Sequence, residues 1–243
     1  MNHEIYKHPK GGWIVKAYEL FPGLAKAVKE AHEKHGLTAS GHDFDHDLRV
    51  AAYALMIAPD KQTGRLAAAA GFCHSADRIL GSIASGGLEE PEKETEIGSL
   101  VREWLNTTDL TSEERDEIVF AVLHHEGAND EADTLLKITL CDADRLANLD
   151  ADVLIRGGQF QPHLLVVDPV HFENDPEATY RDPRSILWDV KNCISWTKES
   201  GPYVLRLPKA RELGASRGAF LQLFIDKIHA QRSEVGLVPY PEL

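Results

Sequence analysis

Cysteine and basic residues are both scarce in this chain of 243 residues. Its three cysteines, Cys73, Cys141 and Cys193, are widely spaced and odd in number, so a disulfide framework is not expected and a reducing cytoplasm fits the composition. Lys and Arg number 26 against 39 Asp and Glu, which gives a formal net charge of −13. This deficit excludes broad binding to nucleic acid or to an anionic membrane, although it allows a local basic pocket.

Long apolar segments are also missing. The longest uninterrupted apolar stretch, residues 66–73, is far shorter than the roughly 20 residues of a membrane span, and the first thirteen residues contain no apolar signal region. No repeat, low-complexity tract or composition shift divides the chain. We therefore expect a soluble cytoplasmic protein with a single domain over residues 1–243 and a core at about residues 20–230. The sequence leaves the oligomeric state open.

Alternation with a period of two, the pattern of a half-buried strand, is limited to residues 203–207. Apolar residues recur instead at helical spacing, so the sequence predicts an all-α, single-domain helical bundle. A capping box, Thr111 with Glu114, opens one of the helices. The predicted helices span residues 23–35, 45–58, 66–79, 92–105, 111–127, 134–155, 184–199 and 208–231. The run 134–155 is the longest, and the glycine pair Gly157 and Gly158 should end it.

The periodicity fails at about residues 159–183, which predicts a long irregular loop. Loops of this length in a compact domain often carry function or cover a site. Two of the twelve histidines of the chain, His163 and His171, lie there and are weaker candidates for a site lid.

Histidine and aspartate gather in three places next to apolar runs. These segments are residues 41–50, 71–78 and 141–146, and they contain His46, His74 and Asp144. Neutral imidazole and carboxylate are the ligands that hold a hydrolytic divalent metal, and their supply from several helices leaves coordination positions open for water and substrate. The pattern therefore predicts a metal site built from side chains of these three segments.

Taken together, the segments resemble the HD-domain superfamily of metal-dependent phosphohydrolases. The family pattern is a histidine that opens one helix, a His-Asp pair that ends another, and an aspartate in a later helix. His46 in HDFDHDLRV, His74 after LAAAAGFC and Asp144 in DADRLANLDA carry the resemblance. It covers roughly residues 20–230 and extends loosely to LPKARELGASRGAFLQLFIDKI in the C-terminal part.

This resemblance implies an HD-type helical bundle and a phosphohydrolase that acts on a nucleotide or another small phosphoester. It also implies a divalent cofactor such as manganese, iron, cobalt or magnesium, with His46, His74 and Asp144 as its ligands. One position departs from the family: Ser75 follows His74 where the family has an aspartate that binds the metal. The alternative is therefore a catalytically impaired HD-like protein with a ligand-binding or regulatory role.

Several neighbouring residues are candidates for supporting roles. Asp77, about one helical turn beyond His74, is a candidate to replace the missing carboxylate, directly or through water, or to take the proton of the attacking water. Arg78 and Arg145 are candidates to neutralise phosphate charge, as is Lys137.

His125 is a candidate further metal or phosphate ligand because it falls on the apolar face of its predicted helix, whereas His124 lies about 100° round. The alternative for this pair is a helix end where an imidazolium ion interacts with the dipole. Asp142 lies about 200° from Asp144 around the helix, so both cannot face one metal. The family pattern favours Asp144. Asp142 would then be either a hydrogen-bond acceptor that orients a ligand histidine without touching the metal, or a solvated charge.

The remaining candidates are weaker. Asp43 is the expected N-cap of the helix that carries His46, with His42 near the rim of the site. A match to the G-x-S-x-G nucleophile motif at Ser216 lies inside a predicted helix instead of at a strand-to-helix turn, so we do not take it as a nucleophile. The other histidines are expected at the surface: His3, His8, His32, His35 and His229.

Overall fold

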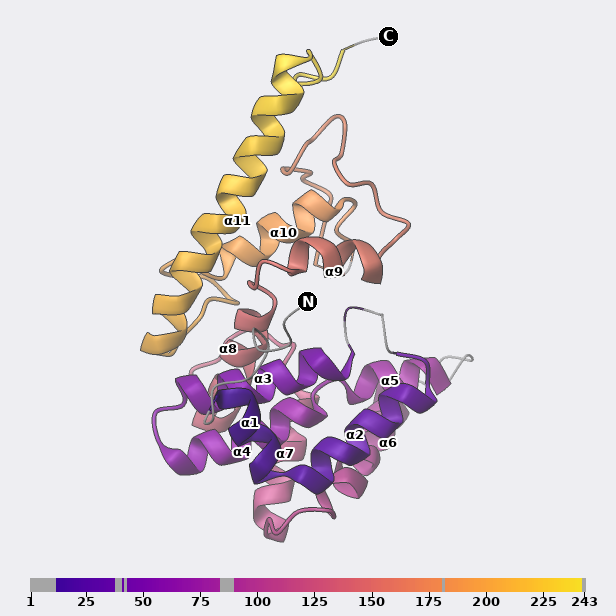
Figure 1. The fold of residues 1–243 in the computed structure, drawn as a ribbon, viewed down its shortest axis with the longest axis vertical. Coiled ribbons are helices and arrows are strands. Elements are labelled where there is room, and N and C mark those ends of the chain that lie inside the picture. Colours follow the sequence, from indigo (N-terminus) through magenta and orange to yellow (C-terminus); the bar gives the residue numbers. More distant parts are fainter. Residues whose placement is uncertain (1–11, 38–40, 42, 84–89, 181, 242–243) are drawn as a thin grey trace, which may run out of the picture.

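The structure is a computed structural model that describes residues 12–37, 41, 43–83, 90–180 and 182–241. Every regular element within these ranges is a helix, which confirms the predicted all-α class (Figure 1). In chain order the helices are α1 Trp13–Leu20, α2 Pro22–Lys34, α3 Phe44–Ile57, α4 Lys61–Cys73, α5 Ala76–Ile83, α6 Glu90–Leu105, α7 Ser112–Leu123, α8 Leu135–Ala147, α9 Val153–Phe160, α10 Ile186–Ser195 and α11 Pro208–Glu234.

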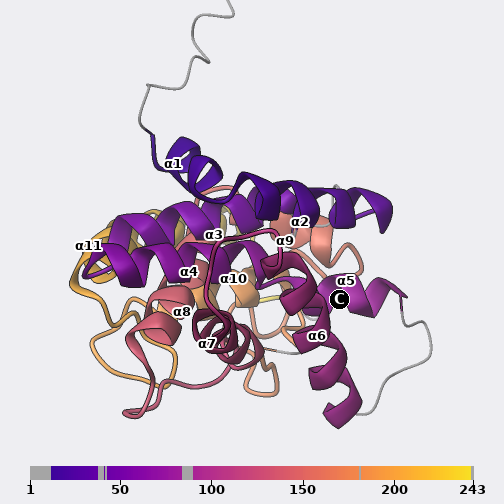
Figure 2. The same ribbon diagram turned by 90° about the horizontal axis from the view of Figure 1, so that it is seen from below.

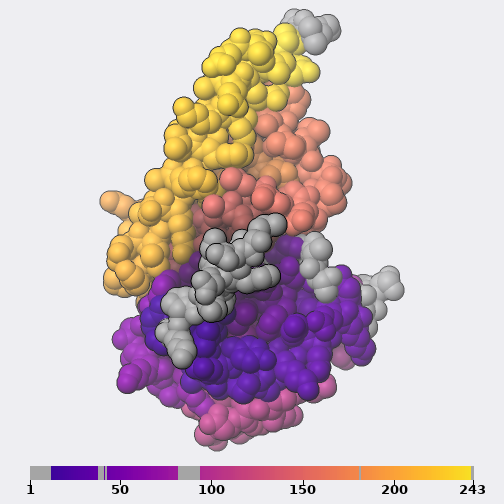
Figure 3. All heavy atoms as spheres, viewed as in Figure 1, coloured from indigo at the N-terminus to yellow at the C-terminus, as the bar shows by residue number. Residues whose placement is uncertain are grey.

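Helices α1–α8 gather at one end of the molecule, and α9–α11 with the loop after α9 form the other end (Figure 1). α3 and α4 pack against each other and both contact α8. α1 and α2 lie across one side of this layer (Figure 2). The space-filling view shows the C-terminal part as a block that stands on the N-terminal helices (Figure 3). α11 contacts α8, α10 and α3 and so ties this block to the bundle.

The apolar run at residues 66–73 predicts a helix buried on all sides, and the structure confirms this for α4. All eight residues of the run are buried. Their small side chains let α3 come very close, because a Cβ added to Gly71 would lie 2.7 Å from the backbone nitrogen of Ala51. This close crossing fixes the distance between the start of α3 and the end of α4, which are the two places where His46 and His74 lie.

Two helices begin at the predicted capping residues. Asp43 is the N-cap of α3, and its side chain accepts a hydrogen bond from the backbone N–H of His46. Thr111 and Glu114 form the capping box that opens α7. These side chains satisfy backbone donors that have no partner within the first helical turn.

The structure corrects several predicted boundaries in the first half of the chain. Helix α1 was not predicted. The predicted helix at 66–79 is two helices, because α4 ends at Cys73 and α5 starts at Ala76, with His74 between them in a helical conformation (φ −66°, ψ −26°). α4 also begins earlier than predicted, where Asp60 accepts the backbone N–H of Thr63. α7 ends at Leu123 and does not reach residue 127.

The prediction of one long helix at 134–155 is wrong. α8 ends at Ala147 with Asn148 as its C-cap, and α9 starts at Val153 and runs through Gly157 and Gly158. Within the described residues α11 is the longest helix. Glycine lowers helix propensity by about 1 kcal/mol, which packing of the helix can override.

The segment between α9 and α10, residues 161–185, is irregular, close to the predicted loop at 159–183. Isolated bridges such as the one between Leu165 and Ser185 are its sole β-type pairs in the described part of the chain. Residues 203–207 form no strand. None of the described helices combines the length and apolar composition needed to cross a membrane.

Candidate metal centre

His46, His74 and Asp144 come together from three different helices of the bundle. His46 lies in the first turn of α3, His74 follows the last residue of α4, and Asp144 lies in α8. Among the described residues they form the one group of histidine, cysteine or acidic side chains that could hold a metal ion. Both histidines are buried, and the side chain of Asp144 is 23% exposed, so one carboxylate faces an accessible space.

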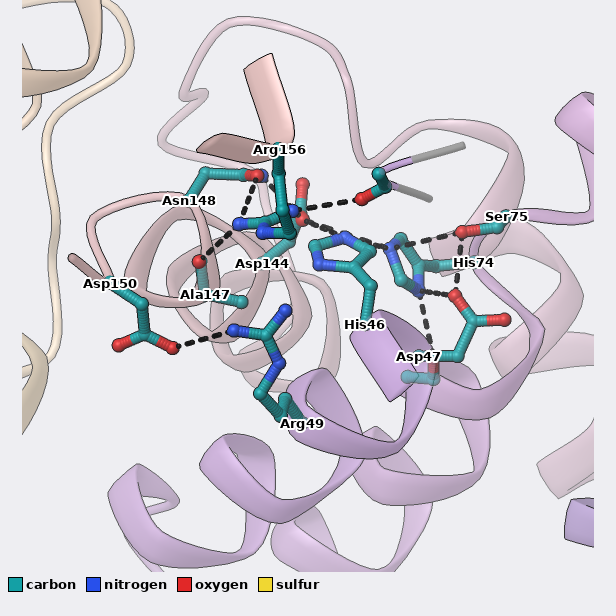
Figure 4. Close-up of polar contacts among 12 residues, drawn as sticks. His46, Asp47, Arg49, His74, Ser75, Asp144, Ala147, Asn148, Asp150 and Arg156 are labelled. Carbon is teal, nitrogen blue, oxygen red and sulfur yellow. Dashed lines mark hydrogen bonds and ion pairs between the residues drawn. The ribbon is translucent and has the colours of Figure 1, made fainter. Parts of the chain in front are cut away.

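The three ligand atoms are spaced for a single ion. His46 Nε2 lies 3.2 Å from His74 Nε2 and 3.3 Å from Asp144 Oδ1, and His74 Nε2 lies 3.7 Å from the same oxygen (Figure 4). The centre of a triangle of this size lies about 2 Å from each corner, and divalent ions such as zinc bind imidazole nitrogen and carboxylate oxygen at about 2.0–2.2 Å. The donor set and its size therefore fit a divalent metal ion.

The backbone holds His74 in the tautomer that a metal ligand needs. His74 Nδ1 lies 2.7 Å from the carbonyl oxygen of Gly71. Because a carbonyl oxygen can only accept a hydrogen bond, Nδ1 must carry the proton. The lone pair of the ring is then on Nε2, the atom that faces His46 and Asp144.

Asp144 has its own supporting residues. Asn148 Nδ2 donates to Asp144 Oδ1 over 2.9 Å. Arg156 lies behind this amide: its guanidinium donates to the carbonyl oxygens of Gly41 and Ala147 and is 3.5 Å from Asn148 Oδ1 (Figure 4). Neither Asn148 nor Arg156 was identified from the sequence. Asn148 lies within the single helix predicted at 134–155, and Arg156 directly follows it, so the turn that places Asn148 beside Asp144 was not predicted.

Burial and neighbouring charge act against each other at this centre. Burial, with the nearby charge of His74, lowers the pKa of His46 despite its contact with Asp144. Burial also disfavours charged His74, but the carboxylates of Asp47 and Asp144 outweigh this and raise its pKa. Burial favours protonated Asp144, yet the hydrogen bond from His46 and the charges of the histidines hold its pKa well below the usual range. Asp144 is therefore anionic, which is the form that binds a cation.

Ser75, the residue after His74, belongs to a buried group of hydrogen-bonded side chains. Its hydroxyl donates to Asp47 Oδ1 over 2.6 Å, and the other oxygen of Asp47 lies 2.7 Å from His32 Nε2. All three side chains are buried. His32 was expected at the surface, and this prediction is wrong, because His32 falls on the same face of α2 as the buried Leu24 and Val28.

A cavity of about 940 Å³ opens beside the triad. His74 lines it from the bundle side, and Phe160, Tyr180 and Trp196 contribute aromatic surface from the C-terminal part. Tyr180 belongs to the loop 161–185, so the predicted long loop does reach the candidate site. Burial of the hydroxyl and the nearby charges of Asp144 and Glu126 raise the pKa of Tyr180, which therefore stays neutral.

Several of the predicted supporting residues line this cavity. Asp77 and Arg78 face it from α5, and Arg78 is held by Asp77 over 3.4 Å and by Glu126 over 3.0 Å. His125 also lines it, with its ring centroid 5.5 Å from that of His74. Nδ1 of His125 lies 2.6 Å from the carbonyl oxygen of Val122, so its Nε2 carries the lone pair. His125 and Asp77 lie outside the group of three that could hold an ion.

Arg145 has a different setting from the expected one. Its guanidinium donates to Asn129 Oδ1 over 2.8 Å and lies 3.9 Å from Asp142 Oδ1. It lines a small neighbouring pocket with Tyr203 and is not among the described residues that line the main cavity. Lys137 does line the main cavity, but its ammonium group donates to Asp133 over 2.6 Å.

Asp142 is neither a solvated charge nor a group that orients a histidine. It is fully buried, and its Oδ2 accepts the backbone N–H groups of Arg206 and Leu207, at 2.8 and 2.6 Å. Leu207 is the N-cap of α11, so Asp142 ties α8 to the start of that helix. Asp142 and Asp144 contact different groups, and Asp144 is the one that lies beside the histidines.

The remaining histidines are not part of the triad. His124 is the C-cap of α7, lines the main cavity and contacts the ring of Phe120. His163, His171 and His229 are exposed and His35 is half-buried. His3, His8 and His42 fall outside the described residues.

Comparison with known proteins identifies a fold and no family. No family model and no curated protein matches this chain. A crystal structure of a Lactobacillus plantarum protein, a Northeast Structural Genomics target, has a TM-score of 0.60 to this structure. The two chains are 21% identical, and the match covers 88% of this chain and 99% of the other. The chain is therefore an all-helical bundle whose architecture recurs in a solved structure, with a candidate divalent-metal centre of its own.

Proposed function

We propose that this chain is a cytoplasmic, divalent-metal-dependent phosphohydrolase of the HD type that acts on a nucleotide or another small phosphoester. The observation that carries the proposal is the triad of His46, His74 and Asp144, whose ligand atoms are spaced for one ion beside a cavity. The order of these residues along the chain, and their helical settings, agree with the family pattern described above. Manganese, iron, cobalt and magnesium are the proposed ions.

His46, His74 and Asp144 would hold a divalent ion, which would supply a coordinated water molecule of lowered pKa and a Lewis acid for a phosphoryl oxygen. The chain supplies the remaining groups. Asp77 lines the cavity, with its side chain 20% exposed, and we assign it as acceptor of the proton from the attacking water. The hydrogen bonds of His74 to Gly71 and of Asp144 with Asn148 fix the orientation in which these two residues would hold the ion.

Arg78 is the cation best placed for a phosphate group. It lines the cavity, its side chain is 35% exposed, and Asp77 and Glu126 hold it in position. A guanidinium fork matches two phosphate oxygens. The local cation is needed because the whole chain carries a net charge of −13, which repels an anionic substrate. Aromatic side chains such as Phe160 offer a surface for the organic part of the substrate.

The proposal is tested with the purified full-length protein by metal analysis and a phosphatase assay. We expect one ion per chain, and hydrolysis of p-nitrophenyl phosphate or of a nucleotide that increases on addition of Mn²⁺ or Co²⁺. Asp144→Asn and His74→Gln should each lower this activity by about 100-fold or more, because each removes a proposed ligand. His229→Gln, at an exposed position on α11, is the matched histidine control and should behave as wild type.

The alternative function predicts a different outcome. Ser75 stands where the family has an aspartate, which favours a protein that binds a ligand or regulates without turnover. An ion bound in the triad without hydrolysis of any phosphoester in a broad panel would support that alternative. Protein that binds no divalent ion, and whose activity is indifferent to the three triad residues, would contradict both the metal centre and the proposed reaction.

A further inference from the structure

Asp47 is a fully buried carboxylate one residue beyond His46 in α3. A charged group with no access to water is costly unless it is paired and hydrogen-bonded. Three polar groups surround it. Oδ2 lies 2.7 Å from His32 Nε2, Oδ1 accepts the hydroxyl of Ser75 over 2.6 Å, and Oδ1 lies 3.4 Å from His74 Nδ1.

These contacts place Asp47 on the outer side of His74. Figure 4 shows the ring of His74 between two carboxylates, with Asp144 towards Nε2 and Asp47 towards Nδ1. A histidine that binds a metal through one ring nitrogen usually donates the other N–H to a carboxylate or a backbone carbonyl, which fixes the ring and strengthens the ligand. His74 has both kinds of acceptor, the carbonyl oxygen of Gly71 and the carboxylate of Asp47.

We propose that Asp47 is the positioning carboxylate of this metal centre, held by His32 and Ser75, and that it aligns and strengthens His74 as a ligand. This inference rests on the proposed metal-dependent function. Ser75 then has a role in the site, as a hydrogen-bond donor to Asp47. The hydroxyl at position 75 is the partner that the neighbouring carboxylate requires, so the negative charge that the family carries at position 75 lies on α3 in this chain.

The residue that the site tolerates at position 75 then depends on the carboxylate of Asp47. An aspartate at position 75 would place a second carboxylate next to Asp47 in a buried region, where the serine oxygen now lies 2.6 Å from Oδ1. Two like charges at such a distance disfavour each other strongly. Ser75→Asp, the change that recreates the family pair, should therefore weaken the site in the presence of Asp47. A site that has decayed through loss of its aspartate should improve instead.

The first experiment measures Co²⁺ binding to full-length protein by titration of the visible absorption bands of the ion. Asp47→Asn keeps the shape of the side chain and removes its charge. We expect about 10- to 100-fold weaker binding, with altered band positions, as for other outer partners of ligating histidines. Asp45→Asn is the matched control on the same helix, because the side chain of Asp45 is 73% exposed and pairs with Arg49.

The second experiment compares Ser75→Asp with the double variant Asp47→Asn plus Ser75→Asp. We expect Ser75→Asp to bind Co²⁺ at least about 10-fold more weakly than wild type, and the double variant to recover most of this loss. Circular dichroism and thermal melting establish that each variant is folded. Folded Asp47→Asn with wild-type affinity and spectrum, or Ser75→Asp with tighter binding than wild type, would overturn the inference.

The metal-free protein separates this inference from the proposed function. In ¹⁵N-histidine spectra the Nδ1–H resonance of His74 should shift in Asp47→Asn and stay in place in Asp45→Asn, because loss of the neighbouring charge weakens the polarisation of that N–H. Wild-type protein that binds no Co²⁺ would overturn the proposed function. An unchanged His74 resonance in Asp47→Asn would overturn the role of Asp47, whatever the metal result.

Discussion

Asp189 lies on α10 at the wall of the cavity. Burial raises the pKa of its carboxyl group to about 6. Between about pH 4 and pH 6 the folded chain therefore holds a proton that the unfolded chain has already released. The free energy of unfolding that depends on this group falls as the pH rises through this window and is constant above it.

Replacement by an amide should remove this pH dependence. We expect Asp189→Asn to be as stable as wild type near pH 4 and more stable by about 2 kcal/mol at pH 7, because the variant buries no charge. Urea unfolding of both proteins at pH 4, 5, 6 and 7 measures the difference. Asp226→Asn, at an exposed position on α11, is the control and should show a constant difference. A difference for Asp189→Asn that is independent of pH would contradict the assignment.

At the scale of single residues, the sequence predicts the triad because the three residues occur in the family's order. The sequence does not predict the role of Asp47, although its position in the helix pattern indicated a buried charge. Asp47 shares a helical face with the buried Val50, Ala51 and Ala54, and a charge on an apolar face needs a partner. The partners, His32 and Ser75, come from other segments of the chain. Contacts between residues so far apart in sequence follow from packing, which no local pattern records.

Between elements, the crossing of α3 and α4 at Gly71 sets the geometry of the triad. A Cβ at this position would lie 2.9 Å from Ala51 Cα and 3.1 Å from the carbonyl carbon of Val50. These are backbone atoms, which cannot move aside as the end of a side chain can. The same residue accepts the N–H of His74. A larger residue at position 71 must therefore push the two histidine-bearing helices apart.

We expect Gly71→Ala to lower the free energy of unfolding by about 1–3 kcal/mol through overpacking, and to weaken Co²⁺ binding at the same time. Gly81→Ala is the matched control in α5, because nothing lies within 4 Å of the added Cβ. An alanine there should stabilise the protein by a few tenths up to about 1 kcal/mol through helix propensity. Thermal unfolding of both variants measures the change in stability, and Co²⁺ titration measures the change in metal affinity. Wild-type metal affinity in Gly71→Ala would show that the crossing does not position the ligands.

Helix ends are predicted well where a side chain caps the backbone and poorly elsewhere. Asp43 and Thr111 accept backbone N–H groups in the first turn of α3 and α7, and both starts are predicted to within a residue or two. The end of α8 has no glycine or proline, so the pattern was extended through residues 148–152. Asn148 stops the helix there. Its side chain then reaches Asp144, and that contact depends on the stop.

Across the whole molecule, the two ends of the chain contribute different parts of the candidate site. All three triad residues belong to α3, the α4–α5 junction and α8. Much of the far wall of the cavity comes from α9, α10 and the loop 161–185, which the sequence predicts as an irregular loop of the kind that often covers a site. The candidate ion site therefore depends on the bundle, whereas the shape of the cavity depends on how the C-terminal part is held against it.

Arg217 on α11 is one of the ties between these parts. Its guanidinium donates to the carbonyl oxygen of Leu146 over 2.8 Å and to Tyr53 Oη over 3.0 Å. It also lies 3.1 Å from Asp150 Oδ1. A single side chain thus connects α11 with α3 and with the turn after α8. The side chain is 21% exposed, so its bonds are partly shielded from water.

We expect Arg217→Met to lower the free energy of unfolding by about 2 kcal/mol, because the change leaves Asp150 and the Leu146 carbonyl without this donor. Since the triad lies wholly in the bundle, Co²⁺ affinity should stay within about twofold of wild type, while the KM for the phosphoester rises. Lys209→Met removes an exposed pair with Glu212 on the same helix and should change stability by less than about 0.5 kcal/mol. Loss of Co²⁺ binding in folded Arg217→Met would mean that the C-terminal part also shapes the metal centre, against the division of the site argued from the structure.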